Sequence, residues 1–146
     1  MYDLKVLSGF SSAHALRGYN GKCENIHGHN WRVELVVSSD VLNEIGLAID
    51  FKLLKKYLNE VVETLDHKFI NESGFFKEVN PSAENIARYI YEEFEKKMKI
   101  NKIFNIAVKR VNVYETDSSM ASYYKIDWLK FINNVLNILK RFKLTY

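Results

Sequence analysis

The sequence predicts an α+β fold in which two helices cover one face of a four-stranded antiparallel sheet, followed by a C-terminal helix. Three observations support this prediction. The 146 residues fit one domain with one core, residues 1–146, and no repeat or linker divides them. Apolar residues alternate in four short segments, as in strands, and recur at helical spacing in three others. The order is two strands, two helices, two strands and a terminal helix. This order favours an antiparallel sheet with helices on one face over an α/β fold with a parallel sheet.

Two N-terminal segments are predicted to form the first half of the sheet. Residues Tyr2–Phe10 alternate loosely between apolar and polar side chains, and Asn30–Ser38 forms the second alternating run. Residues 15–26 contain glycine and asparagine with little periodicity, so they are expected to form a loop between the two strands. A further short extended piece is expected at Gly46–Ile49.

Two central helices are predicted from apolar residues at helical spacing. Asp50 is expected to cap the first helix, Phe51–Leu65. The second helix is expected to have Pro81 in its first turn, with Asn80 or Ser82 as its cap. The apolar stripes comprise Leu54, Tyr57, Leu58, Val61, Val62 and Leu65 in the first helix, and Ile86, Ala87, Ile90, Tyr91 and Phe94 in the second.

The last third of the chain is predicted to complete the sheet and to add a helix. The strands are expected at Ile103–Tyr114 and Met120–Ile126, and the helix at Trp128–Phe142, within a C-terminal helical extension, 127–146. A small four-stranded sheet leaves exposed edges and one uncovered face. Oligomerisation is the simplest way to cover them.

The composition excludes several classes of protein. Hydrophobic residues make up 47% of the chain and charged residues 27%, which is ordinary for a globular protein. No apolar run approaches the ~20 residues that span a bilayer, so no membrane association is expected. A net charge of +3 is too small to indicate nucleic-acid binding. A single cysteine cannot form an internal disulfide, which favours the cytoplasm as the compartment.

Three of the four histidines are candidate metal ligands. Side chains two apart on a strand share a face, so His27 and His29 can present two imidazoles side by side. His14, at the end of the first strand-like run, would complete a three-histidine zinc set that leaves a fourth position open, as in catalytic sites. Structural zinc is disfavoured because it usually needs several thiolates. Most His-x-His pairs are ordinary surface or hydrogen-bonded residues, so the residues alone leave both interpretations open.

Other side chains could carry proton-transfer or binding chemistry. A free cysteine is usually a buried hydrophobe, but Cys23 lies in a polar, glycine-flanked loop, which suits a reactive thiolate better. Asp66 precedes His67; such neighbours are often accidental, yet an aspartate that orients an imidazole tunes a general acid or base. Glu115 ends an apolar strand, where a carboxylate is either solvated or placed to bind a guanidine-like N–H pair.

Seven short motifs follow one another along most of residues 1–126, and their combination and order carry a family resemblance. They are Phe10-Ser-Ser-Ala-His14, Lys22-Cys23, His27-Gly28-His29, Asp50-Phe51, Leu65-Asp66-His67, Pro81-Ser-Ala-Glu84-Asn85 and Tyr114-Glu115-Thr116. Through this combination the chain resembles the 6-pyruvoyltetrahydropterin synthase family, which includes the 6-carboxytetrahydropterin synthases of the queuosine pathway. The segment beyond Trp128 adds nothing to the resemblance.

The resemblance implies a fold, an assembly and a cofactor. The family has the tunnelling fold, in which trimers close their sheets into a barrel and pair into homohexamers with active sites between subunits. Its members are zinc-dependent lyases that act on a small pterin substrate. The residues that match the family's zinc ligands are His14, His27 and His29.

The resemblance also assigns roles to other side chains. Cys23 matches the catalytic thiol, and Asp66 with His67 matches the acid–base dyad. The residues that match the family's pterin-binding positions are Glu115, which anchors the ring, with Thr116 and Ser82 as weaker candidates; Ser82 replaces the family's usual threonine and keeps the hydroxyl.

The spacing around the cysteine bears on which reaction is expected. Three residues separate Cys23 from His27, which resembles the enzymes that convert 7,8-dihydroneopterin triphosphate to 6-carboxy-5,6,7,8-tetrahydropterin. The alternatives are a 6-pyruvoyltetrahydropterin synthase, or an enzyme that gives 6-hydroxymethyldihydropterin for folate synthesis. That last branch has a glutamate in the position of Glu24, so a bifunctional enzyme is a further alternative. A non-catalytic pterin-binding module would have lost the thiol, the dyad or a zinc ligand, and none is lost.

Overall fold

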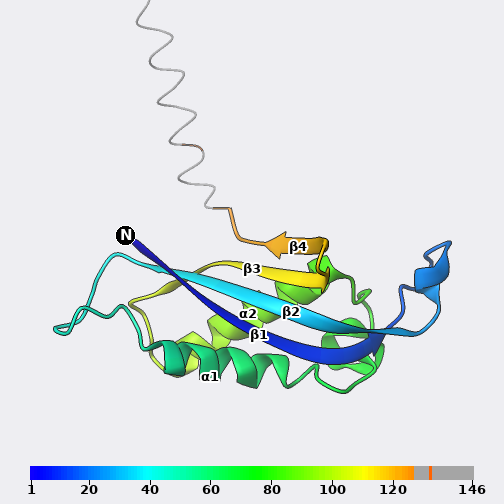
Figure 1. Ribbon diagram of the computed structural model, residues 1–146, viewed down its shortest axis with the longest axis horizontal. Coiled ribbons are helices and arrows are strands. Elements are labelled where there is room, and N and C mark those ends of the chain that lie inside the picture. The colour runs from blue at the N-terminus through cyan, green and yellow to red at the C-terminus, as the bar shows by residue number, and fades with distance from the viewer. Residues whose placement is uncertain (127–131, 133–146) are drawn as a thin grey trace, which may run out of the picture.

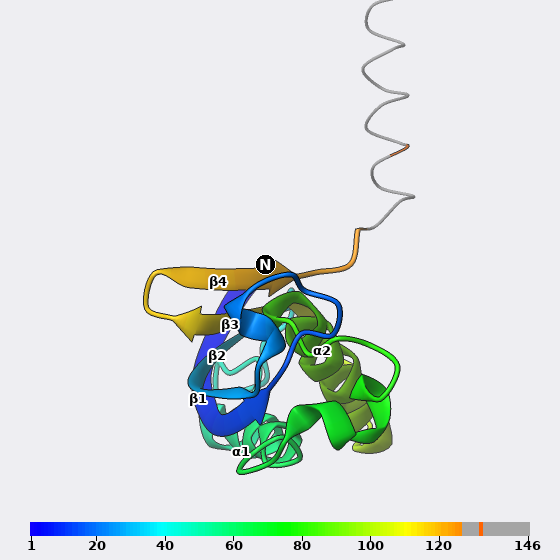
Figure 2. The ribbon, with the colours of Figure 1, turned by 90° about the vertical axis from the view of Figure 1, so that its right-hand side faces the viewer.

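The structure is a computed structural model, which describes residues 1–126 and residue 132. It contains one antiparallel sheet with the strand order β1-β2-β3-β4, formed by β1 (Tyr2–His14), β2 (His27–Ser39), β3 (Ala107–Thr116) and β4 (Ser119–Tyr123). Two helices, α1 (Phe51–Val62) and α2 (Ala83–Ile100), lie on the same side of this sheet (Figures 1 and 2). The predicted α+β class, the four antiparallel strands and the two helices on one face are therefore confirmed.

Both helices begin at caps that the sequence supplies. Asp50 Oδ1 accepts a hydrogen bond from the backbone N–H of Lys52 at 2.7 Å, as expected for the cap of α1. Ser82 Oγ accepts from the backbone N–H of Asn85 at the start of α2, which identifies Ser82 as the cap. Pro81 therefore precedes the helix instead of lying in its first turn, so that part of the prediction is wrong.

The hydrophobic core lies between the sheet and the two helices. Alternate residues of β2 and β3 point toward the helices, and Val33, Leu35, Val111 and Val113 are completely buried there. Leu54 and Leu58 of α1 and Ile86, Ile90 and Phe94 of α2 cover them and are also completely buried. The apolar stripes predicted for both helices thus face the sheet, which fixes the helix-covered face of every strand.

The first two strands are longer than predicted at one end. β1 continues past Phe10 to His14, and β2 starts at His27 instead of Asn30. The β1–β2 ladder runs without interruption to the pair His14 and His27. Apolar periodicity cannot reveal this extension, because the additional residues on the helix-covered face are polar.

A short extended piece was expected at Gly46–Ile49, and this expectation is wrong. The segment consists of turns and bends. The Asn43 side-chain oxygen accepts from the backbone N–H groups of Ile45 and Leu47, and Gly46 has a φ of 80°. A local side-chain-to-backbone turn therefore replaces strand pairing here.

The loop predicted between the helices contains two short 3₁₀ turns, η2 (Ile70–Glu72) and η3 (Gly74–Phe76), and a third, η1 (Lys22–Glu24), lies in the β1–β2 loop. The helix predicted at Trp128–Phe142 lies outside the described residues, apart from Ile132. In the described part of the chain, no helix is both long and apolar enough to cross a membrane.

Candidate metal centre and active site

Strand alternation brings three histidines together at one end of the sheet. On β1, Ser12 and His14 continue the helix-covered face of the strand, and both are buried. In the ladder His14 lies opposite His27, and Ser12 lies opposite His29. The His14 ring centroid is 4.4 Å from that of His27 and 5.2 Å from that of His29. The convergence expected from the spacing therefore occurs within one chain.

Backbone carbonyl groups fix the tautomers of two of these imidazoles. His14 Nδ1 lies 2.7 Å from the carbonyl oxygen of Pro81, and His27 Nδ1 lies 2.7 Å from that of Asn25. A carbonyl oxygen only accepts, so each Nδ1 carries a proton, and in the neutral imidazole each Nε2 then keeps a lone pair. These two Nε2 atoms face one another at 3.0 Å. When both rings are neutral no proton lies between these atoms, and the approach is that expected of two ligands of one cation.

A carboxylate completes the cluster. Glu115 Oε1 lies 3.0 Å from His29 Nε2 and 3.7 Å from His14 Nε2. His29 Nε2 is buried and forms no hydrogen bond within the described residues, so its short approach to Glu115 lacks hydrogen-bond geometry. One ligand atom from each of His14, His27, His29 and Glu115 lies within 4.8 Å of all the others. This arrangement is expected of ligands directed at a common centre.

The donor set fits zinc. Three imidazole nitrogens with one carboxylate oxygen or open position is a usual zinc environment, and neutral imidazole is the form that binds metal. Burial lowers the pKa of His14 below its ordinary value of 6.5, and the nearby His27 lowers it further, although the Pro81 carbonyl acts in the opposite direction. His14 is therefore kept neutral near pH 7, ready to bind a metal.

The cluster opens into a cavity of about 320 Å³ that also contains the cysteine. His14, Cys23, Ser82 and Glu115 all line this cavity, and its other lining residues are Leu16, Tyr19, Ala83, Glu84, Ser119, Met120 and Ala121. Cys23 is half-buried in η1, and its carbonyl accepts from the backbone N–H of Leu16 at 2.9 Å. This bond ties the end of the loop to the segment that follows β1, so the thiol stays beside the histidines.

The Asp66–His67 pair lies on the free edge of β1. Asp66 Oδ1 accepts from the backbone N–H of Ser11 at 2.8 Å, and Asp66 Oδ2 lies 2.8 Å from His67 Nδ1. The Ser11 N–H, followed by His67, lowers the pKa of Asp66, so this carboxyl stays ionised near neutral pH. In the neutral imidazole the carboxylate favours the tautomer with the proton on His67 Nδ1, which leaves Nε2 as the acceptor. Neither residue lines the cavity of its own chain.

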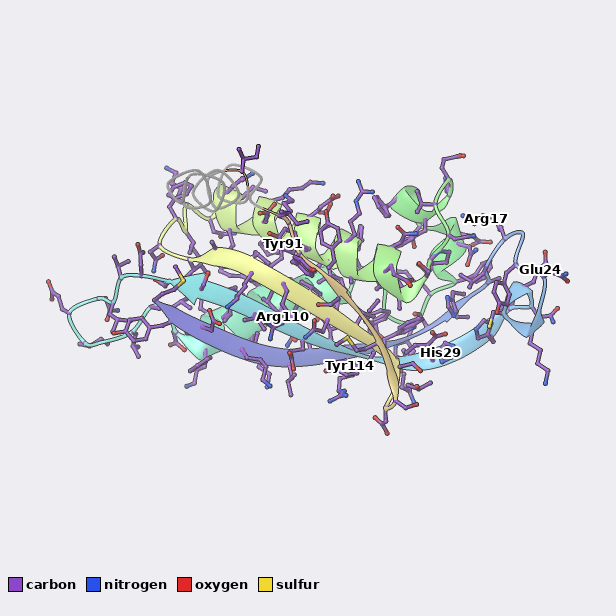
Figure 3. All side chains as sticks on the ribbon, turned by 90° about the horizontal axis from the view of Figure 1, so that it is seen from above. Arg17, Glu24, His29, Tyr91, Arg110 and Tyr114 are labelled. Atoms are coloured by element: carbon purple, nitrogen blue, oxygen red, sulfur yellow. The ribbon has the colours of Figure 1, made fainter. Side chains whose placement is uncertain are left out.

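Two other expected site residues also lie outside the cavity lining. Glu24 follows Cys23 in η1 and is exposed, and it lies at the same end of the molecule as Arg17 and His29 (Figure 3). Thr116 is exposed and lies within hydrogen-bond distance of Ser118. Of the predicted side chains beyond the histidines, the structure brings Cys23, Ser82 and Glu115 together around one cavity.

Two asparagines with no predicted role support the site. The Asn71 side chain accepts from the Ala15 N–H at 2.9 Å and donates to the Ala15 carbonyl at 2.8 Å. Asn80 does the same with Arg17, at 2.9 Å for both bonds. Each amide replaces a neighbouring strand and extends the pairing of β1 beyond His14. Asparagine is common in loops, so composition alone gave no signal for these roles.

Known proteins are similar to this chain in both sequence and fold. The family model described as 6-pyruvoyl tetrahydropterin synthase matches residues 3–125. A protein of Archaeoglobus fulgidus, provisionally named a 6-carboxy-5,6,7,8-tetrahydropterin synthase, is 37% identical over 116 residues, or 80% of this chain and 90% of its own length. The 6-carboxy-5,6,7,8-tetrahydropterin synthase of Synechocystis is 34% identical over 120 residues, or 79% and 87%.

A solved structure has the same fold. The 6-pyruvoyl tetrahydropterin synthase of Caenorhabditis elegans superposes with a TM-score of 0.75 at 26% identity, covering 86% of this chain and 96% of the other. The sheet with its two helices is thus the tunnelling fold, and the histidine–glutamate cluster is consistent with the zinc site of this group. The chain belongs to the 6-pyruvoyl tetrahydropterin synthase family and is a pterin-processing enzyme of its lyase type.

Proposed function

We propose that this enzyme is a zinc-dependent 6-carboxytetrahydropterin synthase that acts on 7,8-dihydroneopterin triphosphate. One observation carries the proposal: the Nε2 atoms of His14 and His27, whose Nδ1 atoms are held by backbone carbonyls, face one another at 3.0 Å beside a cavity lined by Cys23. The relatives from Archaeoglobus fulgidus and Synechocystis support the carboxy product over the pyruvoyl product. The four-residue step from Cys23 to His27 supports it as well.

His14, His27 and His29 would hold the zinc ion. When bound, zinc supplies a Lewis acid that lowers the pKa of the substrate's side-chain hydroxyl groups. The protein prepares the site by burying His14 and by fixing two imidazole tautomers with the carbonyls of Pro81 and Asn25. The backbone bonds that hold these imidazoles limit the reorganisation that would oppose metal binding.

Cys23 and the Asp66–His67 pair would move protons on the substrate side chain. Cys23 reaches the cavity of its own chain from η1. Neutral His67 would act as a base through Nε2, because Asp66 favours the proton on Nδ1. Isomerisation, loss of triphosphate and carbon–carbon cleavage all need proton transfer at the side chain, and two separate bases can act on opposite sides of it.

The location of His67 supports an active site shared between copies of the chain. Its side chain is 82% exposed at the free edge of β1. Its backbone has a φ of 52°, a conformation that favours glycine, and its N–H donates to the Ser11 carbonyl at 2.6 Å. Such strain is often retained where a side chain must be aimed for function. We therefore propose a homohexamer, a dimer of trimers, in which this pair serves the cavity of a neighbouring copy.

Glu115 would anchor the pterin ring in the cavity. A carboxylate accepts two parallel hydrogen bonds from the adjacent N–H groups of a pterin, as it does from a guanidinium. Ser82 lines the same cavity at the N-terminus of α2, where backbone N–H groups favour an electronegative ring atom. Thr116 is the weaker binding candidate, because it is exposed and does not line the cavity.

The product formed from 7,8-dihydroneopterin triphosphate tests the proposal. Zinc-loaded protein should release 6-carboxytetrahydropterin, identified by its mass, and protein stripped of metal by a chelator should release none. A 6-pyruvoyl product as the main species would replace the proposed reaction with that of the pyruvoyl-forming enzymes. A main product of 6-hydroxymethyldihydropterin would assign the chain to the folate-type reaction, with Glu24 as the candidate base. Pterin binding without turnover would indicate a binding module.

A further inference from the structure

Glu115 lies between the histidine cluster and the cavity proposed for the pterin, and its carboxylate cannot bind at both places at once. Its Oε1 atom is 3.0 Å from His29 Nε2 and 3.7 Å from His14 Nε2, whereas its side chain also lines the cavity proposed for the pterin. Both short contacts use Oε1. A pterin's N–H pair needs both carboxylate oxygens, so a Glu115 directed at the histidines is not arranged to bind the ring.

The backbone around Glu115 allows the carboxylate to be re-aimed. The pairing of β3 with β4 shifts register between Tyr114 and Thr116, so Glu115 sits at a strand irregularity. Irregularities of this kind occur next to active sites, where they redirect a side chain. The Glu115 side chain is 31% exposed, and apart from its approaches to His29 and His14 it has no polar side-chain contact among the described residues, so no other partner there holds it in place.

We propose that Glu115 is a displaceable fourth ligand, bound to the metal through Oε1 in the free enzyme and transferred to the pterin N–H pair when substrate enters. This inference rests on the proposed metal site. The exchange moves no proton and no electrons: the carboxylate leaves the metal and accepts two hydrogen bonds. The pterin ring would thereby open the coordination position that the substrate's side-chain hydroxyls then use. Recognition of the ring and access to the metal become one coupled event.

Coupling of this kind must appear in both directions. A ligand that draws Glu115 away from the metal must tighten the binding of any second ligand at the vacated position, and the two effects must be equal. Suitable probes are pterin itself, which has the N–H pair but no side chain to reach the metal, and azide, a small metal-binding anion. The readout is the visible absorption of the Co²⁺-substituted enzyme, measured at one fixed pH without turnover.

In the wild-type enzyme, azide should bind weakly, and saturating pterin should tighten it by about 5- to 150-fold. Glu115→Gln keeps the size of the side chain but is a poor metal ligand. In this variant azide should bind tightly without pterin, and added pterin should change its affinity little. The variant should also bind zinc more weakly in competition with a chelator, because it lacks one of the proposed ligands.

Glu78→Gln is the matched control, because Glu78 is an exposed carboxylate that neither lines the cavity nor belongs to the ligand cluster. It should behave like the wild type in the azide titration. Equal azide affinity with and without pterin in the wild type would overturn the proposal, and this arm needs no variant. Coupling abolished by Glu78→Gln and not by Glu115→Gln would also overturn it.

The same experiment separates this inference from the proposed function. Co²⁺ bound by the histidines without any pterin–azide coupling would overturn the carboxylate exchange and leave the zinc enzyme standing. Failure to bind Co²⁺ or Zn²⁺ at all would overturn both. If the enzyme forms 6-carboxytetrahydropterin but pterin does not change its affinity for azide, Glu115 binds the pterin alone and is not a metal ligand.

Discussion

The histidine cluster and the Asp66–His67 pair both place imidazoles beside the end of β1, but they are built in opposite ways. His14 is almost completely buried on the helix-covered face, and its partners come from the adjacent strand. His67 is 82% exposed on the strand's free edge and is held by backbone bonds to Ser11. One chain therefore brings the candidate metal ligands together but leaves the Asp66–His67 pair outside its own cavity. The difference predicts that metal binding needs one copy and catalysis needs two.

The largest effect should come from removing a histidine of the cluster. His27→Ala should lower the zinc content from about one ion per chain to nearly none and reduce product formation to background, because zinc needs all three nitrogens. His67→Ala is the matched comparison, since it also removes an imidazole beside β1. It should retain zinc while losing activity. Metal analysis of both purified variants checks the prediction, and loss of zinc from the His67 variant would contradict the division between the two regions.

Loss of the thiol should be almost as damaging to turnover but not to the metal. Cys23 lines the cavity yet is not part of the ligand cluster. Cys23→Ala should therefore lower kcat by about 10²–10⁴-fold, the usual contribution of a general base, with zinc content unchanged. Metal analysis beside steady-state kinetics provides the measurement. A drop in zinc content parallel to the loss of activity would mean that the thiol serves the metal.

Mixing two inactive variants tests whether the two regions act across copies. Hexamers co-expressed from Cys23→Ala and His67→Ala chains contain some cavities with an intact thiol from one copy and an intact imidazole from the next. About one quarter of wild-type activity should return at random assembly, because each site needs the right copy on both sides. Homogeneous oligomers of each variant are the controls. No recovery in verified mixed oligomers would place both groups in one chain's site.

The fold was largely predictable because the core follows apolar periodicity. Val33 and Leu35 alternate on β2, and Leu54 and Leu58 repeat at helical spacing, so each pattern matches one buried face. The strand ends near the site were missed for the same physical reason. His14 and His27 continue the alternation with polar side chains, which a search for apolar residues does not detect.

The candidate site was predictable in its members but not in its arrangement. The His-x-His spacing gave a shared face, and His14 and Cys23 were already candidates from their positions in the sequence, whereas their convergence on one cavity depends on the folded chain. The position of Glu115 beside His29 depends on the register of β3 and on an irregularity at its end, and neither can be read from residue types. The exposure of His67 likewise depends on its left-handed backbone at the edge of β1.

A smaller effect is expected from the residue that connects the two regions. Asn71 lies in η2, close to the Asp66–His67 segment in the chain, and its buried amide makes both backbone bonds of Ala15, next to His14. Asn71→Ala leaves two buried backbone groups without partners and should lower the free energy of unfolding by about 2–4 kcal/mol. Asn80→Ala removes the same pair of bonds at a more exposed position. It should cost about 1 kcal/mol or less, because water can replace the lost partners.

Urea unfolding of the zinc-free proteins at equal concentration checks this pair of variants. Equal losses of unfolding free energy in the two variants would show that burial does not decide how much these amide–backbone bonds stabilise the fold. If only Asn71→Ala also weakens zinc binding, the Asn71 bonds to Ala15 position His14 as well as stabilising the fold. Unchanged zinc affinity in both variants would limit the two asparagines to stability.

The smallest effect on the proposed reaction is expected at Glu24. Its side chain is exposed and does not line the cavity of its own chain, although it follows Cys23 in the same turn. Glu24→Gln should leave zinc content unchanged and alter formation of the carboxy product by less than about 3-fold, far below the effect of removing a general base. If the enzyme also releases 6-hydroxymethyldihydropterin, that product alone should be lost, and quantifying both by mass in one reaction measures the split. Equal loss of both products would make Glu24 a shared part of the Cys23 region. An unchanged product profile would leave it as a solvated charge of the loop and the enzyme with a single activity.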